Sequence, residues 1–215
     1  MTLFSIKHFR QAGGFLLLGL LGLTAAQAAA ETRTIVFFGD SLTAGYGLND
    51  PSSEAYPALL QDKIEREKLG WRAVNAGLSG ETTSGGLRRV DWILRQPVDI
   101  FVLALGGNDG LRGIDPAVSR ENLEKIVERV RAKNPNVKLV LAGMQIPPAM
   151  GRDFSREFES IFPAVAAKNN ATLVPFLLEG VGGRLDLNQP DRIHPTARGH
   201  EIMADTVWKV LRPLL

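Results

Sequence analysis

The sequence predicts an α/β fold, a three-layer α/β/α domain built on five parallel strands. Short apolar runs alternate with segments of helical spacing, a pattern typical of a parallel sheet covered by helices on both faces. Each run ends in a turn rich in glycine or proline, and right-handed crossovers between parallel strands leave few topologies. The five runs are Thr34–Phe38, Trp71–Asn75, Ile100–Leu105, Val137–Ala142 and Thr172–Val174.

Two of the intervening segments have clear apolar stripes at helical spacing. The first helix is expected to open at Asp115-Pro116 and to end at Asn134-Pro135, because these residues are typical helix start and stop signals. Its stripe consists of Leu123, Ile126, Val127 and Val130, and the stripe of the C-terminal helix consists of Met203, Val207, Val210 and Leu211.

The first thirty residues have the features of a secretory signal peptide. A basic start without any acid precedes an apolar run, which is followed by small residues suited to a cleavage site. The apolar run is too short to span a bilayer comfortably. These features are Lys7, His8 and Arg10, the run Phe15–Leu23 and the segment Ala26–Ala30.

We therefore expect residues 1–30 to be removed, by cleavage after Ala28 or Ala30, and residues 31–215 to form a single folded domain. A chain processed in this way would be periplasmic or secreted, with no transmembrane anchor after cleavage.

The remaining composition excludes several functional classes. Removing Lys7 and Arg10 from the 25 basic residues leaves 23, which equals the 23 acidic residues. A chain with this balance has no excess of positive charge that would attract nucleic acid. The absence of cysteine and of paired histidines at helical spacing argues against a metal site. No phosphate-binding loop with its lysine occurs either. A domain without metal or cofactor is expected.

Ser41 follows the first predicted strand after only two residues, Gly39 and Asp40. In parallel sheets, ligands bind beyond the carboxyl ends of the strands, so Ser41 is placed where chemistry is expected. A serine hydroxyl needs a neighbouring base before it attacks an acyl carbon. Ser41 is the candidate nucleophile.

The candidate base is His194, which lies in the polar segment Asp191-Arg192-Ile193-His194-Pro195. Asp191, three residues earlier, is suited to orient one ring nitrogen and to stabilise the imidazolium. Of the other two histidines, His8 leaves with the leader and His200 lies within a helical pattern. Asp40 and Asp109 are rival acids, which we interpret as groups that stabilise local turns.

Four short blocks occur in the order and places typical of the GDSL, or SGNH, hydrolases, and the chain resembles that family over nearly its whole length. The residues Gly106–Gly113 and Leu173–Phe176 are most similar to the bacterial group of thioesterase I, lysophospholipase L1 and arylesterase. The blocks are Gly39–Leu42, Asn75–Thr82, Gly106–Asp109 and Asp191–His194.

The resemblance implies a flavodoxin-like SGNH fold with strand order 2-1-3-4-5. It also implies an oxyanion hole made by the backbone N–H groups of Ser41 and Gly80 and the side-chain amide of Asn108. Such preorganised donors stabilise the tetrahedral intermediate of acyl transfer. One departure from the family pattern is Arg192, which stands where a glycine is more usual.

The function expected from these features is a serine esterase for acyl esters, thioesters or lysophospholipids. An apolar groove near the strand ends supports this interpretation. Two alternatives remain open: a carbohydrate O-deacetylase of the same superfamily, and a non-catalytic periplasmic module that binds a small ligand. The predicted substrate-binding residues are Leu42, Leu78, Leu111, Ile114, Ile146 and Pro147.

Overall fold

Five parallel strands form one sheet in the order β2-β1-β3-β4-β5, which confirms the predicted fold and strand order. The computed structural model describes residues 1–2 and 32–215, so the leader lies outside the described residues apart from Met1 and Thr2 and stays a prediction. The strands are β1 (Arg33–Gly39), β2 (Trp71–Gly77), β3 (Ile100–Ala104), β4 (Lys138–Ala142) and β5 (Thr172–Val174).

The burial of the strands follows their place in the sheet. Residues 34–39 of β1 and all five residues of β3 are buried, because both strands have neighbours on two sides and helices on both faces. The edge strand β2 is less covered: Trp71 is buried, Arg72 and Asn75 are exposed, and its other residues are half-buried. The continuous apolar runs in the sequence therefore mark the centre of the sheet.

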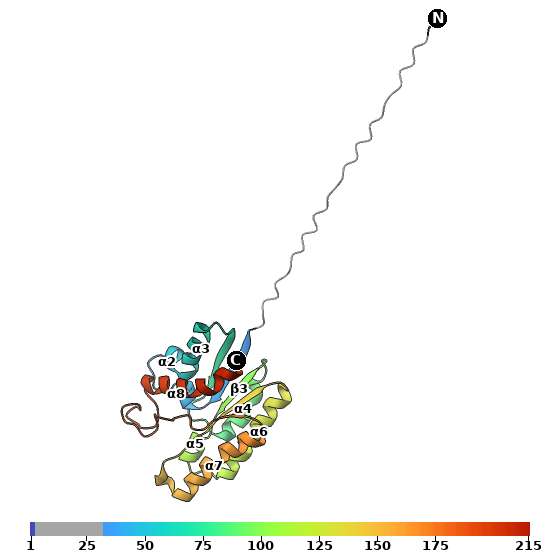
Figure 1. Ribbon diagram of the computed structural model, residues 1–215. Coiled ribbons are helices and arrows are strands. Elements are labelled where there is room, and N and C mark those ends of the chain that lie inside the picture. Colours follow the sequence, from blue (N-terminus) through green and yellow to red (C-terminus); the bar gives the residue numbers. More distant parts are fainter. Residues whose placement is uncertain (3–31) are drawn as a thin grey trace. The chain divides into compact units, whose positions relative to one another are not determined.

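Helices cover the sheet on both faces (Figure 1). The helices α3 and α8 pack on each other on one face, where α2 also contacts α8. On the other face α6 packs between α4 and α7. The helices are α1 (Ser41–Ala44), α2 (Pro51–Glu54), α3 (Tyr56–Arg66), α4 (Thr83–Ile93), α5 (Gly107–Leu111), α6 (Pro116–Lys133), α7 (Arg152–Lys168) and α8 (Ala197–Leu211), with 3-10 turns η1 (Pro148–Met150) and η2 (Arg212–Leu214).

The long helix α6 begins and ends where the sequence predicts. The Asp115 side chain accepts from the N–H of Ala117 at the start, Pro116 occupies the first position, and Asn134 follows the last residue. The predicted stripe of this helix is buried, and so is that of α8 except for the half-buried Val210. In the part of the chain that the structure describes, no helix combines the length and apolar character needed to cross a bilayer.

The first three strands end in register at one edge of the sheet. Gly39 lies opposite both Gly77 of β2 and Ala104 of β3. A Cβ atom at Gly39 would lie 2.1 Å from the Thr43 Oγ1 and 2.7 Å from the Ala104 carbonyl oxygen, so only glycine allows the chain to turn there. The turns that follow β1, β2 and β3 are consequently brought together at this edge.

Candidate active site

Ser41 is the first residue of α1, immediately beyond the carboxyl end of β1. Asp40 caps the helix, because its carboxylate accepts from the N–H of Leu42 at 3.0 Å. The Ser41 residue is buried with 8% of its surface exposed, and it lines a pocket at the edge of the sheet. The short turn from β1 into α1 thus holds Ser41 in the wall of the pocket.

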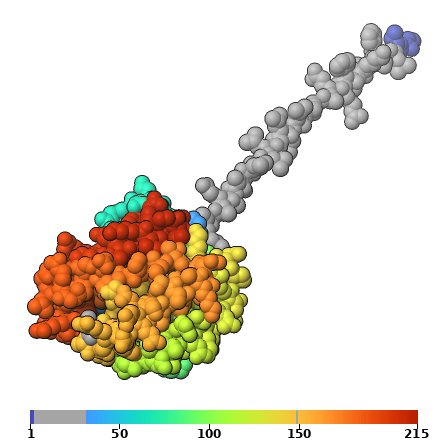
Figure 2. Space-filling view, turned by 60° about the horizontal axis from the view of Figure 1, so that its bottom comes forward, coloured from blue at the N-terminus to red at the C-terminus, as the bar shows by residue number. Residues whose placement is uncertain are grey.

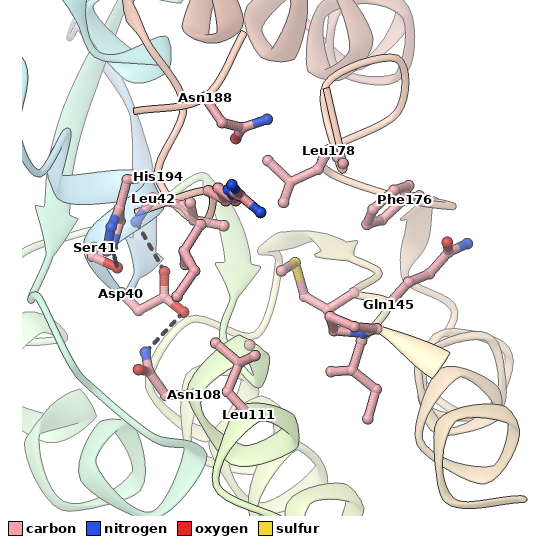
Figure 3. A pocket seen from close by; sticks show the side chains of 18 residues that line it. Asp40, Ser41, Leu42, Asn108, Leu111, Gln145, Phe176, Leu178, Asn188 and His194 are labelled. Carbon is pink, nitrogen blue, oxygen red and sulfur yellow. Dashed lines mark hydrogen bonds between the residues drawn. The ribbon is translucent and has the colours of Figure 1, made fainter. Parts of the chain in front are cut away.

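A continuous hydrogen-bond chain joins the three predicted catalytic side chains. The Ser41 Oγ lies 2.9 Å from the His194 Nε2, and the His194 Nδ1 lies 2.6 Å from the Asp191 Oδ2. Figure 3 shows Ser41 and His194 side by side at one end of the pocket. A hydroxyl, an imidazole and a carboxylate in this order are able to move a proton from the hydroxyl to the ring while the acid stabilises the imidazolium.

The loop between β5 and α8 is folded tightly around His194. The Asp191 Oδ1 accepts from the backbone N–H groups of Ile193 at 2.9 Å and His194 at 3.0 Å. The N–H of Gln189 donates to the His194 carbonyl at 2.7 Å, which closes the loop. The position of the imidazole is therefore fixed by backbone bonds as well as by the Asp191 side chain.

Two residues that the sequence reasoning missed also support this loop: Gln189, which lies within it, and Tyr46, which contacts it from the turn after α1. The Gln189 Nε2 donates to the carbonyl oxygens of Tyr46 at 2.8 Å and Pro195 at 3.0 Å, so it ties the turn after α1 to the histidine loop. The Tyr46 ring packs against the His194 ring with 4.6 Å between centroids. Neither residue has a local sequence signal, because each acts on a segment more than a hundred residues away.

The carboxyl of Asp191 is held in its ionised form. Although partial burial alone would raise its pKa, hydrogen bonds from the His194 ring and from the N–H groups of His194 and Ile193 lower the pKa to about 2. The group therefore carries its charge at any pH at which the protein works, as an orienting acid requires.

The rival acids occupy other environments. Burial raises the pKa of Asp40 to about 6, even though the N–H of Leu42 donates to it. Asp109 is not confined to its own turn, contrary to our interpretation from the sequence. Its carboxylate accepts from the Thr83 N–H at 2.9 Å, the Thr83 hydroxyl at 2.5 Å and the Ser119 hydroxyl at 3.2 Å, so it joins α4 to α6. Neither acid bonds to the His194 ring.

His200 is a packing residue in the interior, with 1% of its surface exposed. Its Nδ1 accepts from the Tyr56 N–H at 3.2 Å, and the two rings are stacked. Burial, with a smaller effect of the charge on His194, lowers the pKa of His200 to about 4. The ring is thus neutral and serves the contact between α3 and α8.

Of the three predicted oxyanion donors, Ser41 and Asn108 line the pocket, and Gly80 lies in the turn between β2 and α4. Within the described residues, the N–H groups of Ser41 and Gly80 donate to no protein acceptor. Gly80 has a φ of 78°, and its carbonyl, which belongs to the peptide that follows the donor N–H, accepts from the Arg112 guanidinium at 3.0 Å. The Asn108 Nδ2 donates to the Glu81 carbonyl at 3.1 Å and lies 3.4 Å from the Asp40 carboxylate.

A cavity of about 460 Å³ extends from Ser41, within the usual size range of small-molecule sites. Phe176 and Gln145 lie at the end of the cavity away from Ser41 and His194 (Figure 3). On the face shown in Figure 2, the chain from α7 to the C-terminus occupies most of the surface. The cavity wall is mostly apolar and includes Leu42, Leu111, Met144, Ile146, Pro147, Phe176 and Leu178.

Two of the six predicted substrate-binding residues lie outside the cavity wall. Leu78 is 53% exposed in the turn after β2, and Ile114 is half-buried beyond α5. Leu78 directly follows β2, whereas α5 lies between β3 and Ile114, and neither residue lines the cavity. Leu42, Leu111, Ile146 and Pro147 do line it.

The backbone conformation at Arg192 explains why a glycine is more usual at this position. Arg192 has a φ of 63°, in the left-handed region, and it lines the rim of the cavity. A non-glycine residue in this conformation costs about 1–2 kcal/mol, part of which the greater freedom of glycine in the unfolded chain offsets. The tight loop imposes this backbone angle whatever residue stands there.

Replacing Arg192 by glycine is expected to raise the melting temperature by about 1–3 °C, because the strain at a positive φ is removed. The measurement is thermal unfolding followed by circular dichroism. Arg192→Ala is the matched control, since it removes the same charge and keeps the strain. A glycine variant that is no more stable than the alanine variant would contradict the explanation.

Comparison with known proteins agrees with this geometry. Residues 37–202 match the GDSL-like lipase/acylhydrolase family. The chain belongs to this family. Esterase TesA of Pseudomonas aeruginosa is 40% identical over 201 residues, which cover 93% of this chain and 98% of the relative.

Two further similarities involve named GDSL hydrolases. Thioesterase 1/protease 1/lysophospholipase L1 of Escherichia coli is 38% identical over 208 residues, which cover 96% of this chain and 95% of the relative. The crystal structure of the psychrotrophic esterase EstA from a Pseudoalteromonas species, inhibited by monoethylphosphonate, has a TM-score of 0.79 and 34% identity and covers 85% of this chain and 98% of that one. The GDSL relatives with these names are ester and thioester hydrolases.

Proposed function

We propose that the protein is a serine esterase that hydrolyses acyl ester and thioester bonds through an acyl-enzyme intermediate. The observation that supports this most strongly is the unbroken hydrogen-bond chain from the Ser41 hydroxyl through His194 to Asp191. Membership of the GDSL family and the esterase and thioesterase names of the relatives point the same way.

In the first half-reaction, the Ser41 Oγ attacks the acyl carbon while the His194 Nε2 takes the hydroxyl proton. The carbonyl oxygen becomes an oxyanion that accepts from the N–H groups of Ser41 and Gly80 and from the Asn108 amide. The intermediate then collapses, the bond to the leaving group breaks, and His194 returns the proton to the departing alcohol or thiol. The acyl group is left as an ester on Ser41.

In the second half-reaction, water attacks this ester and His194 accepts its proton. The second oxyanion uses the same donors, and its collapse releases the carboxylic acid as His194 returns the proton to Ser41. Asp191 stays ionised throughout and stabilises the imidazolium in both halves.

The wall of the cavity favours an acyl chain as the bound group. Apolar side chains cover most of the path from Ser41 to Phe176, and each methylene buried against them contributes about 0.8 kcal/mol. An acetylated sugar would place hydroxyl groups against these side chains without partners, so we disfavour the deacetylase alternative. Fatty esters and lysophospholipids are the substrates we propose for an exported enzyme.

Export itself is proposed from the leader, whose basic start and short apolar run are typical of secretory signals. Acyl thioesters of coenzyme A are cytoplasmic, so thioester cleavage would be a capacity seen with purified protein.

The experiment that tests the proposal is a series of p-nitrophenyl esters with acyl chains of two, four, eight and twelve carbons. We expect kcat/KM to rise by at least about 100-fold from the C2 to the C8 ester, since each added methylene is buried. An acetylated sugar assayed beside them should be a poor substrate. A strict preference for acetyl groups would instead support the deacetylase.

Repeating the same ester series with the variant Gly182→Leu tests where the far end of the bound acyl chain lies. Gly182 lines the cavity, and a Cβ atom there would lie 3.2 Å from the Phe176 ring, so a larger side chain shortens this end. The variant should lose activity on C12 and C8 esters and retain it on C2 and C4. Glu179→Leu, at an exposed position of the same loop outside the wall, is the control. Equal losses of activity on esters of every acyl length would show that the acyl chain does not extend toward Gly182.

A further inference from the structure

One guanidinium, that of Arg89 on α4, bonds to three segments of the chain behind the candidate site. Its Nε donates to the two carboxylate oxygens of Glu81 at 2.8 and 2.7 Å. Its Nη2 donates to the backbone carbonyls of Ala76 at 2.8 Å and Gly39 at 3.3 Å, and it also contacts the Glu81 carboxylate. No other guanidinium in the described part of the chain donates to the ends of two strands.

Each acceptor of Arg89 is close in sequence to a proposed oxyanion donor. Gly39 ends β1 two residues before Ser41, and Ala76 lies in β2 four residues before Gly80. Glu81 follows Gly80 directly, and its backbone carbonyl accepts from the Asn108 amide at 3.1 Å. The segments that carry all three donors are therefore joined through this side chain and its partner.

The hydrogen bonds between Arg89 and Glu81 are suited to holding these segments in a fixed position. The Glu81 side chain is 3% exposed and that of Arg89 is 21% exposed, so the pair is largely shielded from water. A buried carboxylate requires a charged partner, and the Arg89 carbon Cζ also lies 4.1 Å from the centroid of the Phe38 ring. A lysine presents a single flexible ammonium and would not reproduce the planar fork.

We propose that Arg89, paired with Glu81, is a positioning residue that aligns the three oxyanion donors, an inference that rests on the proposed function. Arg89 does not line the cavity, so it touches no substrate. Its effect falls on the oxyanion, which exists in the transition state and not in the bound substrate. The rate of the chemical step then depends on Arg89, whereas substrate affinity does not.

The test compares Arg89→Met and Arg89→Lys with Arg88→Met, a substitution of the exposed neighbouring arginine on the same helix. With the p-nitrophenyl C8 ester, Arg89→Met should lower kcat by about 100-fold and leave KM within about twofold, as does the loss of an oxyanion donor. The kcat of Arg89→Lys should stay below a tenth of the parent value. The kcat of Arg88→Met should equal that of the parent. Thermal unfolding of each variant, followed by circular dichroism, shows that it is folded at the temperature of the assay.

A double-variant cycle separates positioning from a general structural role. If Arg89 acts through the donors, Arg89→Met should cost much less in the Asn108→Ala background than in the parent, because the two changes disturb the same element. Independent, multiplicative losses, or a change confined to KM, would overturn the proposal.

Glu81→Gln provides a second route should Arg89→Met fail to fold. It keeps the size and the backbone carbonyl of Glu81 and removes the charge that orients Arg89, so a smaller loss in kcat alone is expected. An unchanged kcat would overturn the proposal. Hydrolysis that persists in Ser41→Ala would overturn the proposed function itself, whereas Ser41-dependent hydrolysis unaffected by Arg89→Met would overturn only the positioning role.

Discussion

Ser41→Ala is expected to lower kcat by about 10⁶-fold, since the loss of a nucleophile removes the covalent route entirely. The fold should survive, because alanine is well suited to the first turn of α1 and the Ser41 hydroxyl bonds only to His194. The Asp40 cap, which begins the helix, is left intact.

The measurement is hydrolysis of the C8 ester, combined with labelling by a fluorophosphonate and mass spectrometry of the intact protein. The parent should take up one phosphonyl group per chain and Ser41→Ala none. Ser160→Ala, an exposed serine of α7, is the matched control and should label like the parent. Labelling of the Ser41 variant would show that another residue is the nucleophile, and an unlabelled parent would favour the non-catalytic binding module.

The second large effect is expected at His194. His194→Gln should lose about as much activity as Ser41→Ala, because the members of such a triad act as a unit. Glutamine is able to hydrogen-bond to Ser41 but not to take its proton, so the variant tests proton transfer rather than packing.

His200→Gln is the matched control for this prediction. Its ring is buried and neutral and bonds to the Tyr56 backbone, so the change should lower the melting temperature and leave kcat of the folded protein nearly unchanged. If the His200 variant were inactive when folded and the His194 variant active, the assignment of the base would be wrong.

The fold could be predicted because its central strands are continuous buried runs. Residues 34–38 of β1 and the whole of β3 are apolar or small and are bounded by glycine, which gives few alternatives once helices alternate with them. The strand order followed from the family resemblance, since hydrophobic patterns do not specify which strands are neighbours. The ends of strands differed by one or two residues, as with Gly77, because pairing with Gly39 extends the ladder of β2.

The candidate site was only partly visible in the sequence. Ser41, Asp191 and His194, the residues that we propose as catalytic, stand in local sequence contexts that point to this role. The pair of Glu81 and Arg89 looks like an ordinary pair of surface charges, and only the packing of α4 behind the strand ends makes it buried. Leu78 shows the opposite failure, because its place after a strand did not determine the direction of its side chain.

The distance in sequence between Ser41 and His194 has a consequence for synthesis of the chain. The two residues meet across 153 positions, and the loop that carries His194 is held between β5 and α8. A ribosome therefore completes the ends of β1, β2 and β3, with the proposed oxyanion donors, long before it adds the proposed base. Until residue 194 has been added, Ser41 lacks the side chain that we propose as its base. Under the proposed function, nascent chains and fragments that end before residue 194 lack the base and are expected to be inactive on esters.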